Sequence, residues 1–380
     1  MFVGYSYKKS RLVRARFASP RNSETESRFI SMWQPESKRS CQTNVRQQEA
    51  EELNPSTAFL QCLELILPWL TPQELANVSL TSKSLNQISK SITHRRSSDA
   101  SRSSENLPIP FHNTADNRPY AYFIYTPSQI LPSFASQFLR QSWGLGSCVR
   151  PNSVSRLCVE PVRLVDELGE SASGCDCQRC EDQVRCPCTG LNGLDIASEC
   201  GSSCGCGLEC GNRLTQRGVS LRLKIVRDRR KGWGLFADQF IGKGQFVCEY
   251  AGELLTTKEA TSRQQMYDEL VSGGHFSSAL LVLREHLPSG KACLRMNIDA
   301  TRIGNVARFI NHSCDGGNLS TKLVRSTGAL LPRLCFFSSR DIKENEELSF
   351  SYGEIRLTSN GLQCFCGSSC CFGTLPSEHT

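Results

Sequence analysis

Apolar positions along the chain change their spacing twice. Residues 1–50 are polar, rich in Arg and Ser and without a regular apolar period, which predicts a disordered basic tail. Between residues 53 and 93 the apolar residues recur at helical spacing, and this favours a small helical unit. From residue 217 to 353 they alternate in short stretches separated by Gly and by Asn or Asp, as in strands joined by turns. We therefore expect the later part of the chain to be mainly β.

The helical unit carries its own start signals. Ser56 or Thr57 can cap a first helix, and residues 71–74 (TPQE) form a capping box that places Pro72 at the first position of a second helix. The apolar positions expected to hold the unit together are Phe59, Leu60, Leu63, Ile66, Leu67, Leu75, Val78, Leu80, Leu85 and Ile88. Residues 67–89 also resemble an F-box, a module that docks adaptors of ubiquitin ligases. An ordinary helical interaction segment is the alternative.

The region from 217 to 353 has one convincing helical pattern, EATSRQQMYDELV at 259–271. The Ser-rich, charged stretch 94–106, which precedes it in the chain, is expected to be a linker. The segments that alternate like strands are 219–226, 244–254, 294–299, 331–339 and 346–353.

Composition narrows the class of protein. At 380 residues, with 39% apolar and 21% charged residues, the chain fits a globular protein of two or three domains with polar segments between them. The net charge of +7 allows contact with nucleic acid without showing it. Six Lys or Arg and no acid occur in the first 21 residues, which fits a solvated arm, a phosphate contact or a transit peptide. No apolar run reaches the roughly 18 residues that span a bilayer.

Cysteine is the outlier, with 21 residues. The N-terminus lacks the apolar run of a secretory signal, so we expect reduced thiols that are available to metals. Nine of them form the cysteine block: Cys175, Cys177, Cys180, Cys186, Cys188, Cys200, Cys204, Cys206 and Cys210. Nine thiolates satisfy three tetrahedral zinc ions if three of them bridge, because six terminal and three doubly counted ligands give twelve bonds. This arithmetic favours a three-zinc cluster over a disulfide knot or a redox pair.

A second set of cysteines lies near the C-terminus. Cys364, Cys366 and Cys371 supply three ligands, where zinc takes four. Cys314, which ends the motif RFINHSC at 308–314, is the obvious fourth. Cys370 could replace Cys371, and the spacing leaves that open. We call the set Cys314, Cys364, Cys366 and Cys371 the tail site, and predict one zinc there.

Four motifs resemble those of one enzyme family: KGWGLFA (231–237), EYAGEL (249–254), IGNVARFINHSC (303–314) and ELSFSYGE (347–354). Together with the cysteines they resemble a SET-domain histone lysine methyltransferase of the plant suppressor-of-variegation-related branch. Residues 105–125 look like the strand that opens a pre-SET segment. The resemblance implies a mainly β SET fold of short curved sheets with a pseudo-knot. Its expected parts are pre-SET 105–215, SET 217–354 and post-SET 360–376.

The resemblance also implies a function. Such an enzyme transfers methyl groups from S-adenosylmethionine to a lysine of a histone tail, here expected to be the ninth residue of histone H3, in transcriptional silencing. It would act in the nucleus on chromatin and bind the tail as an added strand through main-chain hydrogen bonds. The alternatives are a catalytically weak chromatin scaffold and a methyltransferase for a non-histone protein.

By the same resemblance, Tyr352 is the catalytic tyrosine and Phe350 a residue of the lysine channel that favours di- or trimethylation. Asn311 would bind the methionine end of the cofactor, and His312 would meet the adenine through its main chain. This role replaces the reading of His312 and Cys314 as a hydrolase-like pair. The cofactor-binding residues implied are Lys231, Gly232, Trp233, Gly234, Arg308, Phe309, Asn311 and His312.

The chain departs from the family pattern at several positions. No tyrosine stands in the strand before the 303–314 motif, and Ala279 or a neighbour takes its place, which puts one wall of the channel in question. Ser351 stands where Asp is usual and Phe372 where Arg is usual. Residues 126–174 look like an insertion before the cysteine block.

Overall fold

The computed structural model describes residues 55–135, 163, 165, 168–170, 173–178, 180, 186, 188, 196–272, 278–286, 293–353 and 362–376. The predicted basic tail, 1–50, and most of the expected insertion, 126–174, lie outside these residues. None of the helices in the described part is long and apolar enough to cross a membrane.

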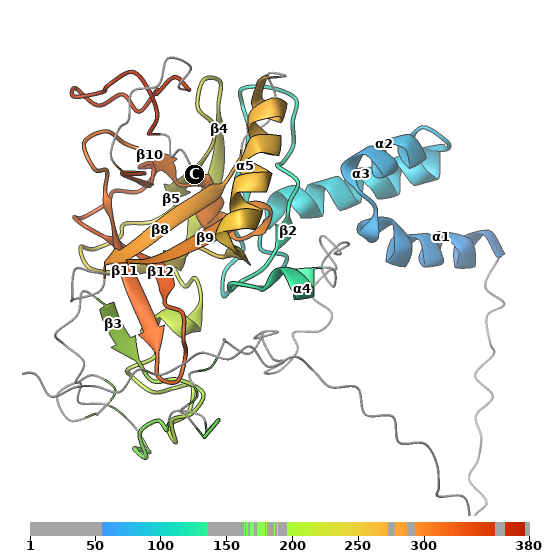
Figure 1. Cartoon of the computed structure of the whole chain (residues 1–380). Coiled ribbons are helices and arrows are strands. Elements are labelled where there is room, and N and C mark those ends of the chain that lie inside the picture. Colours follow the sequence, from blue (N-terminus) through green and yellow to red (C-terminus); the bar gives the residue numbers. More distant parts are fainter. Residues whose placement is uncertain are drawn as a thin grey trace, which may run out of the picture.

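Helices at the start of the described chain form a small unit on one side of a β body (Figure 1). They are α1 (Pro55–Ile66), the 3-10 turn η1 (Leu67–Trp69), α2 (Pro72–Ser79) and α3 (Lys83–Ser98). The predicted capping box is confirmed, because the Thr71 hydroxyl accepts from the Glu74 N–H and the Glu74 carboxylate accepts from the Thr71 N–H. Leu67, Leu75 and Ile92 are buried between these helices.

Several expectations for this unit are wrong. Ser56 and Thr57 lie inside α1, which begins at Pro55, so neither is its cap. Pro needs no partner for its nitrogen and is well suited to a first helical position. Phe59, Ile66 and Leu80 are 60%, 56% and 84% exposed and do not belong to the core. They fit the helical period, but no second layer of structure covers that side of α1 and α2 among the described residues.

The expected linker at 94–106 is also wrong in its first part, because α3 continues to Ser98. Arg96 explains the longer helix. Its guanidinium is fully buried and donates to the carbonyls of Pro68 (3.1 Å) and Leu70 (2.6 Å) and to the Tyr120 hydroxyl (3.0 Å). A buried charge of this kind is tolerated only where its donors are paired. The stretch is therefore a packed joint between the helical unit and the segment that contains Tyr120.

Among the described residues, the strands of the β body form three sheets and one short pair. The first sheet has the order β1 (Phe111–His112), β4 (Leu223–Asp228), β5 (Gly232–Ala237). The second has the order β3 (Ile196–Glu199), β11 (Leu319–Ser326), β12 (Arg333–Ser338), β6 (Phe246–Glu249). The third has the order β2 (Ile124–Tyr125), β9 (Cys293–Gly304), β7 (Gly252–Leu255), with β8 (Leu280–His286) also paired to β9. The pair is β10 (Asn311–His312) with β13 (Ser349–Phe350).

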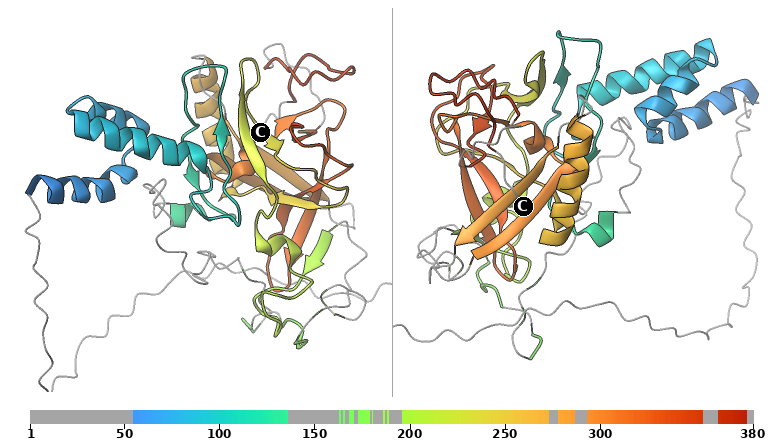
Figure 2. Two further views of the ribbon diagram at one scale, coloured as in Figure 1. Left: turned by 180° about the vertical axis from the view of Figure 1, so that it is seen from behind. Right: turned by 45° about the horizontal axis from the view of Figure 1, so that its top comes forward.

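Short helices complete the body. They are α4 (Pro132–Ala135), α5 (Thr257–Ser272), and the 3-10 turns η4 (Leu214–Arg217) and η5 (Val306–Phe309). α5 confirms the helix predicted at 259–271 and lies against β7 and β9. Figure 2 shows from two further sides that α1 to α3 project away from the sheets, whereas α5 lies on them.

Each of the predicted strand segments contains a strand, and β3, β5, β8, β10 and β11 were missed. β5 contains Gly232 and Gly234, which indicated a turn, and β11 (LSTKLVRS) mixes charged and apolar residues because it is only partly buried. One buried cluster joins residues of the segment 105–215, such as Phe111 and Phe123, to Ile225 and Phe336 of the segment 217–354. The two segments therefore share a core.

Candidate active site and metal centres

The sulfur atoms of the cysteine block lie at the spacing of metal ligands. Cys188 and Cys204 are 3.6 Å apart, Cys175 and Cys180 3.8 Å, and Cys200 and Cys210 4.0 Å. A tetrahedron with Zn–S bonds of about 2.3 Å has edges of about 3.8 Å, whereas a disulfide needs about 2.05 Å. All are free thiols, so the donor set fits zinc.

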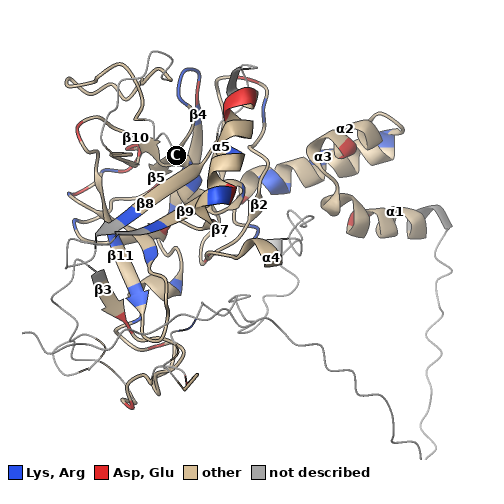
Figure 3. Cartoon of the chain, viewed as in Figure 1, with Lys and Arg blue, Asp and Glu red and all other residues tan. Residues whose placement is uncertain are grey.

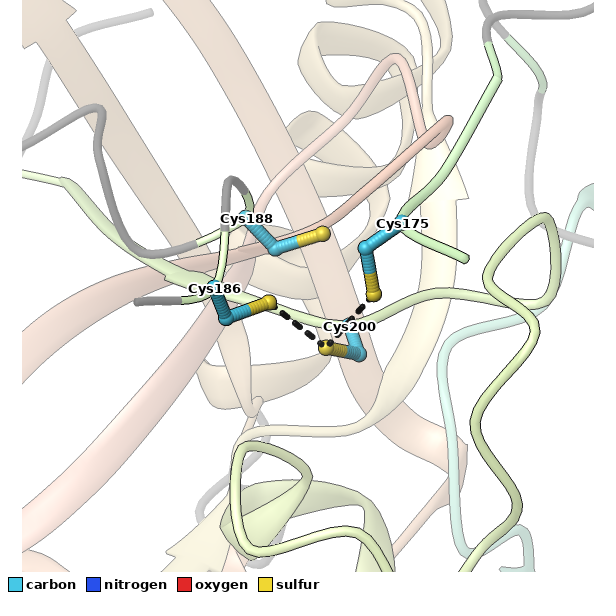
Figure 4. A group of neighbouring side chains, drawn as sticks. All are labelled: Cys175, Cys186, Cys188 and Cys200. Atoms are coloured by element: carbon cyan, nitrogen blue, oxygen red, sulfur yellow. Dashed lines mark hydrogen bonds between the residues drawn. The ribbon is translucent and has the colours of Figure 1, made fainter. Parts of the chain in front are cut away.

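The block's sulfurs are shared between several possible ligand sets. They form four overlapping groups of four within 4.8 Å, which together include all nine cysteines, and Cys175 and Cys200 each belong to three of the four groups. Figure 4 shows one group, in which the sulfurs of Cys175, Cys186, Cys188 and Cys200 converge. Shared membership is the geometry that bridging thiolates require, which agrees with the zinc arithmetic.

As thiolates, the cysteines of the block would carry negative charge, which groups other than the sulfurs must balance. Burial raises the pKa of the Cys175 and Cys200 thiols well above the ordinary value. Two polar side chains supply donors: Asn212 Nδ2 lies 3.4 Å from the Cys200 sulfur, and Arg213 Nη2 3.6 Å from that of Cys206. The Gly201 N–H adds a third donor, 3.3 Å from the Cys204 sulfur. Nine thiolates would carry far more charge than these donors offset, so divalent cations are the fitting counter-charge.

The tail site assembles from segments fifty residues apart. The sulfurs of Cys314, Cys364, Cys366 and Cys371 all lie within 4.8 Å of one another, and Cys314 is 3.8 Å from Cys364. Cys370 is exposed and its sulfur lies 3.1 Å from the Ser368 hydroxyl, outside the group. The spacing left open whether Cys370 or Cys371 completes the set, and the structure groups Cys371 with the other three sulfurs.

The parallel pair β10–β13 brings the predicted site residues together. Asn311 lies opposite Ser349 and His312 opposite Phe350. The Tyr352 hydroxyl, just beyond β13, donates to the Ile310 carbonyl at 2.7 Å, and its ring lies 5.0 Å from that of Phe350. Tyr352 is 39% exposed as a whole, but desolvation of its phenol raises its pKa above the usual range, so the phenol is protonated at neutral pH.

His312 lies between this tyrosine and the tail site. Its Nδ1 accepts from the Tyr352 N–H at 3.1 Å, and its Nε2 lies 3.3 Å from the Cys314 sulfur. The ring is 6% exposed, and burial lowers its pKa, so the imidazole is neutral. Because Cys314 belongs to a set of four sulfurs, the contact is not the isolated nucleophile–base pair of a hydrolase.

A glycine cradle lies beside Asn311. A Cβ on Gly234 would lie 2.9 Å from Glu347 Oε1 and 3.0 Å from Asn311 Nδ2, closer than side chains pack. Glu347 accepts from Asn311 Nδ2 (2.8 Å) and from Lys231 Nζ (2.6 Å). The motifs at 231–237 and 347–354 therefore meet at Asn311. Glu347 was missed, although it lies inside the quoted motif ELSFSYGE.

Other predicted cofactor residues lie deeper. Phe309 is 4% exposed, and its ring packs 5.5 Å from that of Phe123. Arg308 donates to the main-chain carbonyls of Ala300 (2.8 Å) and Thr301 (3.0 Å), and burial lowers its pKa to about 10. Their side chains support the η5 turn from inside, so a ligand would meet this part of the motif mainly through main-chain atoms.

Gly232 and Trp233, which are adjacent in the motif KGWGLFA, have different surroundings. Gly232 has φ +85°, a conformation that favours glycine. The Trp233 ring is partly buried against the main core, with its centre 5.3 Å from that of Phe111 and 5.5 Å from the Arg227 guanidinium. The residues GWG therefore begin a strand, β5, in which Gly234 lets the side chains of Asn311 and Glu347 come close to the main chain.

The structure also describes the departures from the family pattern. Ala279, which with its neighbours is a candidate for the channel-wall position in question, accepts at its carbonyl from the buried hydroxyl of Tyr250 at 2.8 Å. Burial raises the pKa of Tyr250 well above its usual range, and the nearby Tyr352 phenol raises it further. Tyr250 was missed as a site residue, although EYAGEL contains it. Ser351 and Phe372 are exposed.

Comparisons with known proteins agree with this geometry. The SET-domain family matches residues 232–353. The chain is 60% identical over 345 residues to the histone-lysine N-methyltransferase SUVR3 of Arabidopsis thaliana, an alignment that spans 87% of this chain and 96% of SUVR3.

Two solved structures resemble the described fold. Arabidopsis thaliana SUVH6 in complex with SAM matches with a TM-score of 0.53 and 28% identity, over 73% of this chain and 55% of that one. KRYPTONITE in complex with mCHH DNA, H3(1-15) peptide and SAH matches with a TM-score of 0.52 and 27% identity, over 73% and 53%. The mainly β SET fold expected from the motifs is confirmed.

Proposed function

We propose that this chain, which belongs to the SET-domain histone-lysine N-methyltransferases and uses S-adenosylmethionine, methylates the lysine at position nine of the histone H3 tail. The observation that carries the proposal is the alignment with SUVR3 over 96% of that protein. The H3(1-15) peptide bound by KRYPTONITE contains position nine. We further propose that the enzyme acts on chromatin in the nucleus, in transcriptional silencing.

The cofactor is proposed to lie against the glycine cradle. S-adenosylmethionine, when bound, supplies a methyl group on a positively charged sulfur. Gly234 lets Asn311 and Glu347 come close to the main chain of β5, and Asn311, held by Glu347, would present its amide to the methionine end. His312 would contact the adenine through its main chain. The other residues proposed to complete the site are Lys231, Trp233, Arg308 and Phe309.

Tyr352 is proposed to position the lysine amine. Its O–H donates to the Ile310 carbonyl, so the oxygen's lone pairs remain available to accept from an amine N–H. Because the phenol stays protonated, it orients a neutral amine and stabilises the positive charge that develops on it without removing a proton. An in-line displacement gains much of its rate from such alignment.

Phe350 is proposed to set the degree of methylation. Its ring is 5% exposed and packs edge-to-face on Phe336 with centres 4.8 Å apart. A phenylalanine here carries no hydroxyl to hold a water or crowd the amine, so the amine can turn after the first transfer. Di- or trimethylated product is expected.

Zinc is proposed at both sulfur sites, with three ions in the cysteine block and one in the tail site. Burial of the block's thiols and the sulfur spacings near 3.8 Å support this assignment. The tail-site ion would fasten residues 362–376 beside Tyr352 and close one side of the lysine channel.

The substrate is proposed to bind as an added strand. Lys and Arg outnumber Asp and Glu in the sequences of β8, β9 and β11 (Figure 3), so these strands do not offer a basic tail a complementary charge. Main-chain hydrogen bonds with side-chain pockets need no net charge.

The test uses the full chain with radiolabelled S-adenosylmethionine and H3(1–15) peptides that carry either lysine or alanine at position nine. We expect label only in the lysine peptide, di- or trimethylated product by mass spectrometry, and a fall of about 100-fold or more in the Tyr352→Phe variant. Label in nuclear proteins other than histones would replace the histone assignment. S-adenosylhomocysteine binding without any transfer would favour a scaffold, which the missing channel tyrosine at Ala279 would then explain.

A further inference from the structure

The imidazole of His312 has no assigned task in the proposed chemistry, since only its main chain is expected to meet the cofactor. Yet the side chain is buried, its ring lies 5.3 Å from that of Tyr352, and both of its nitrogens have partners.

The partners determine where the proton sits. The main-chain N–H of Tyr352 can only donate, so Nδ1 of His312 must be the unprotonated acceptor. A neutral imidazole with a bare Nδ1 carries its proton on Nε2, and that atom lies 3.3 Å from the Cys314 sulfur. The Nε2–H therefore donates to a ligand sulfur of the tail site.

Building on the proposed function, we propose that His312 is a positioning residue that couples the tail-site metal to the catalytic tyrosine. On one side, the Nε2–H of His312 donates to the Cys314 sulfur and stabilises its thiolate form, which is the form that binds a metal. On the other side its bare nitrogen holds the main chain of Tyr352, whose hydroxyl is already fixed on Ile310.

Neighbouring contacts make the coupling stiff. Ser313 donates its N–H to the Phe350 carbonyl at 3.0 Å, and Asn318 donates its N–H to the Ser349 carbonyl at 3.1 Å. The chain on either side of Cys314 is therefore tied to β13. The Cys314 sulfur cannot shift without moving His312 or this ladder. Groups that hydrogen-bond metal ligands typically change metal affinity by about 10- to 100-fold when they are removed.

Two amide substitutions separate the two halves of the proposal. An asparagine amide reaches about as far as Nδ1, so His312→Asn can keep an acceptor for Tyr352 and loses the donor to Cys314. A glutamine amide reaches about as far as Nε2, so His312→Gln can keep the donor and loses the acceptor. Ser351→Ala is the matched control, because that exposed side chain is next to Tyr352 but bonds to Gly353.

The first readout is metal release, measured without substrate by transfer of zinc to a chromogenic chelator. We expect His312→Asn to release tail-site zinc about 10-fold faster than the wild type, and His312→Gln and Ser351→Ala to release it at the wild-type rate. His312→Gln should instead lower kcat while KM for the peptide stays near its wild-type value. Release at the wild-type rate from His312→Asn would overturn the proposal, as would equally fast release from both amide variants.

A second measurement needs no substitution and guards against misfolding of the variants. In wild-type protein loaded with cadmium-113, the Nε2–H proton of His312 should show scalar coupling to the tail-site cadmium through the N–H···S hydrogen bond. A His312 protonated on Nδ1 instead would overturn the proposal. Because neither this spectrum nor zinc release requires a histone, failure of the substrate assignment would leave both results interpretable.

Discussion

The two sulfur sites use the same ligand atoms on different supports. In the cysteine block the buried cluster consists of cysteines alone, and seven of its nine are buried. In the tail site only Cys364 is buried, and the other three are half-exposed. Figures 1 and 2 show the described part of the cysteine block, next to β3, at one end of the β body and residues 362–376 at the opposite end.

Their attachments differ as well. The block is joined to the second sheet by the parallel pairing of β3 with β11 and by Arg333, which binds Glu199 at 3.0 Å and Glu249 at 3.2 Å. The tail site is instead attached to β10 and Tyr352, because His312 of β10 contacts both the Cys314 sulfur and the Tyr352 N–H. The metal proposed for the block would therefore replace a hydrophobic core, whereas the metal proposed for the tail site would hold a wall of the proposed active site.

The largest effect is expected from Cys200→Ser, because Cys200 belongs to three of the four sulfur groups. Structural zinc contributes about 10–16 kcal/mol of binding free energy in small zinc domains, comparable to the whole stability of a typical domain. We expect global unfolding and a loss of more than one zinc, measured by thermal denaturation and metal analysis. Cys177→Ser, which affects a single group, should be milder.

Metal analysis of the wild type sets the baseline for this comparison. We expect four zincs per chain, and two or fewer would contradict a bridged cluster. Equal thermal denaturation of the Cys200→Ser and Cys177→Ser variants would also count against it.

A smaller effect on stability, with a large effect on activity, is expected from Cys366→Ser. The tail would lose its metal and its position beside Tyr352, and misplacement of about 1 Å can cost about 100-fold in rate. We expect methyl transfer to fall at least that much while the melting temperature changes by only a few degrees. Cys370→Ser is the control, since that exposed thiol lies outside the tail site, and it should match the wild type in both measurements. Global unfolding of Cys366→Ser would remove the contrast between the two sites.

The smallest effect on stability and metal content is expected from Phe350→Tyr. Phe350 is packed on Phe336 and contacts no ligand sulfur, so zinc content should not change, and the added hydroxyl should cost about 1–3 kcal/mol of unfolding free energy. The product should shift toward monomethyl-lysine, measured by mass spectrometry. An unchanged product distribution would show that Phe350 does not set the degree of methylation.

Local patterns predicted much of the fold. The capping box at Thr71 and the helix at 259–271 depend on residues three or four positions apart, so short-range chemistry was enough. β5 was missed because its glycines indicate a turn. A glycine is needed at position 234 because Glu347 and Asn311 lie close to it, and these two residues are far away in the sequence. Arg96 was assigned to a linker because nothing near it in sequence shows that Tyr120 and two carbonyls receive its donors.

The sequence by itself determined the chemistry: the number and spacing of thiols and the motifs around Asn311 and Tyr352. Only the tertiary structure decided between Cys371 and Cys370, brought Glu347 to Asn311, and placed His312 between Cys314 and Tyr352. The physical reason is that ligand and hydrogen-bond geometry depend on distances of a few ångströms between segments far apart in the chain. Residue spacing does not fix such distances, whereas the parallel pairing of β10 with β13 does.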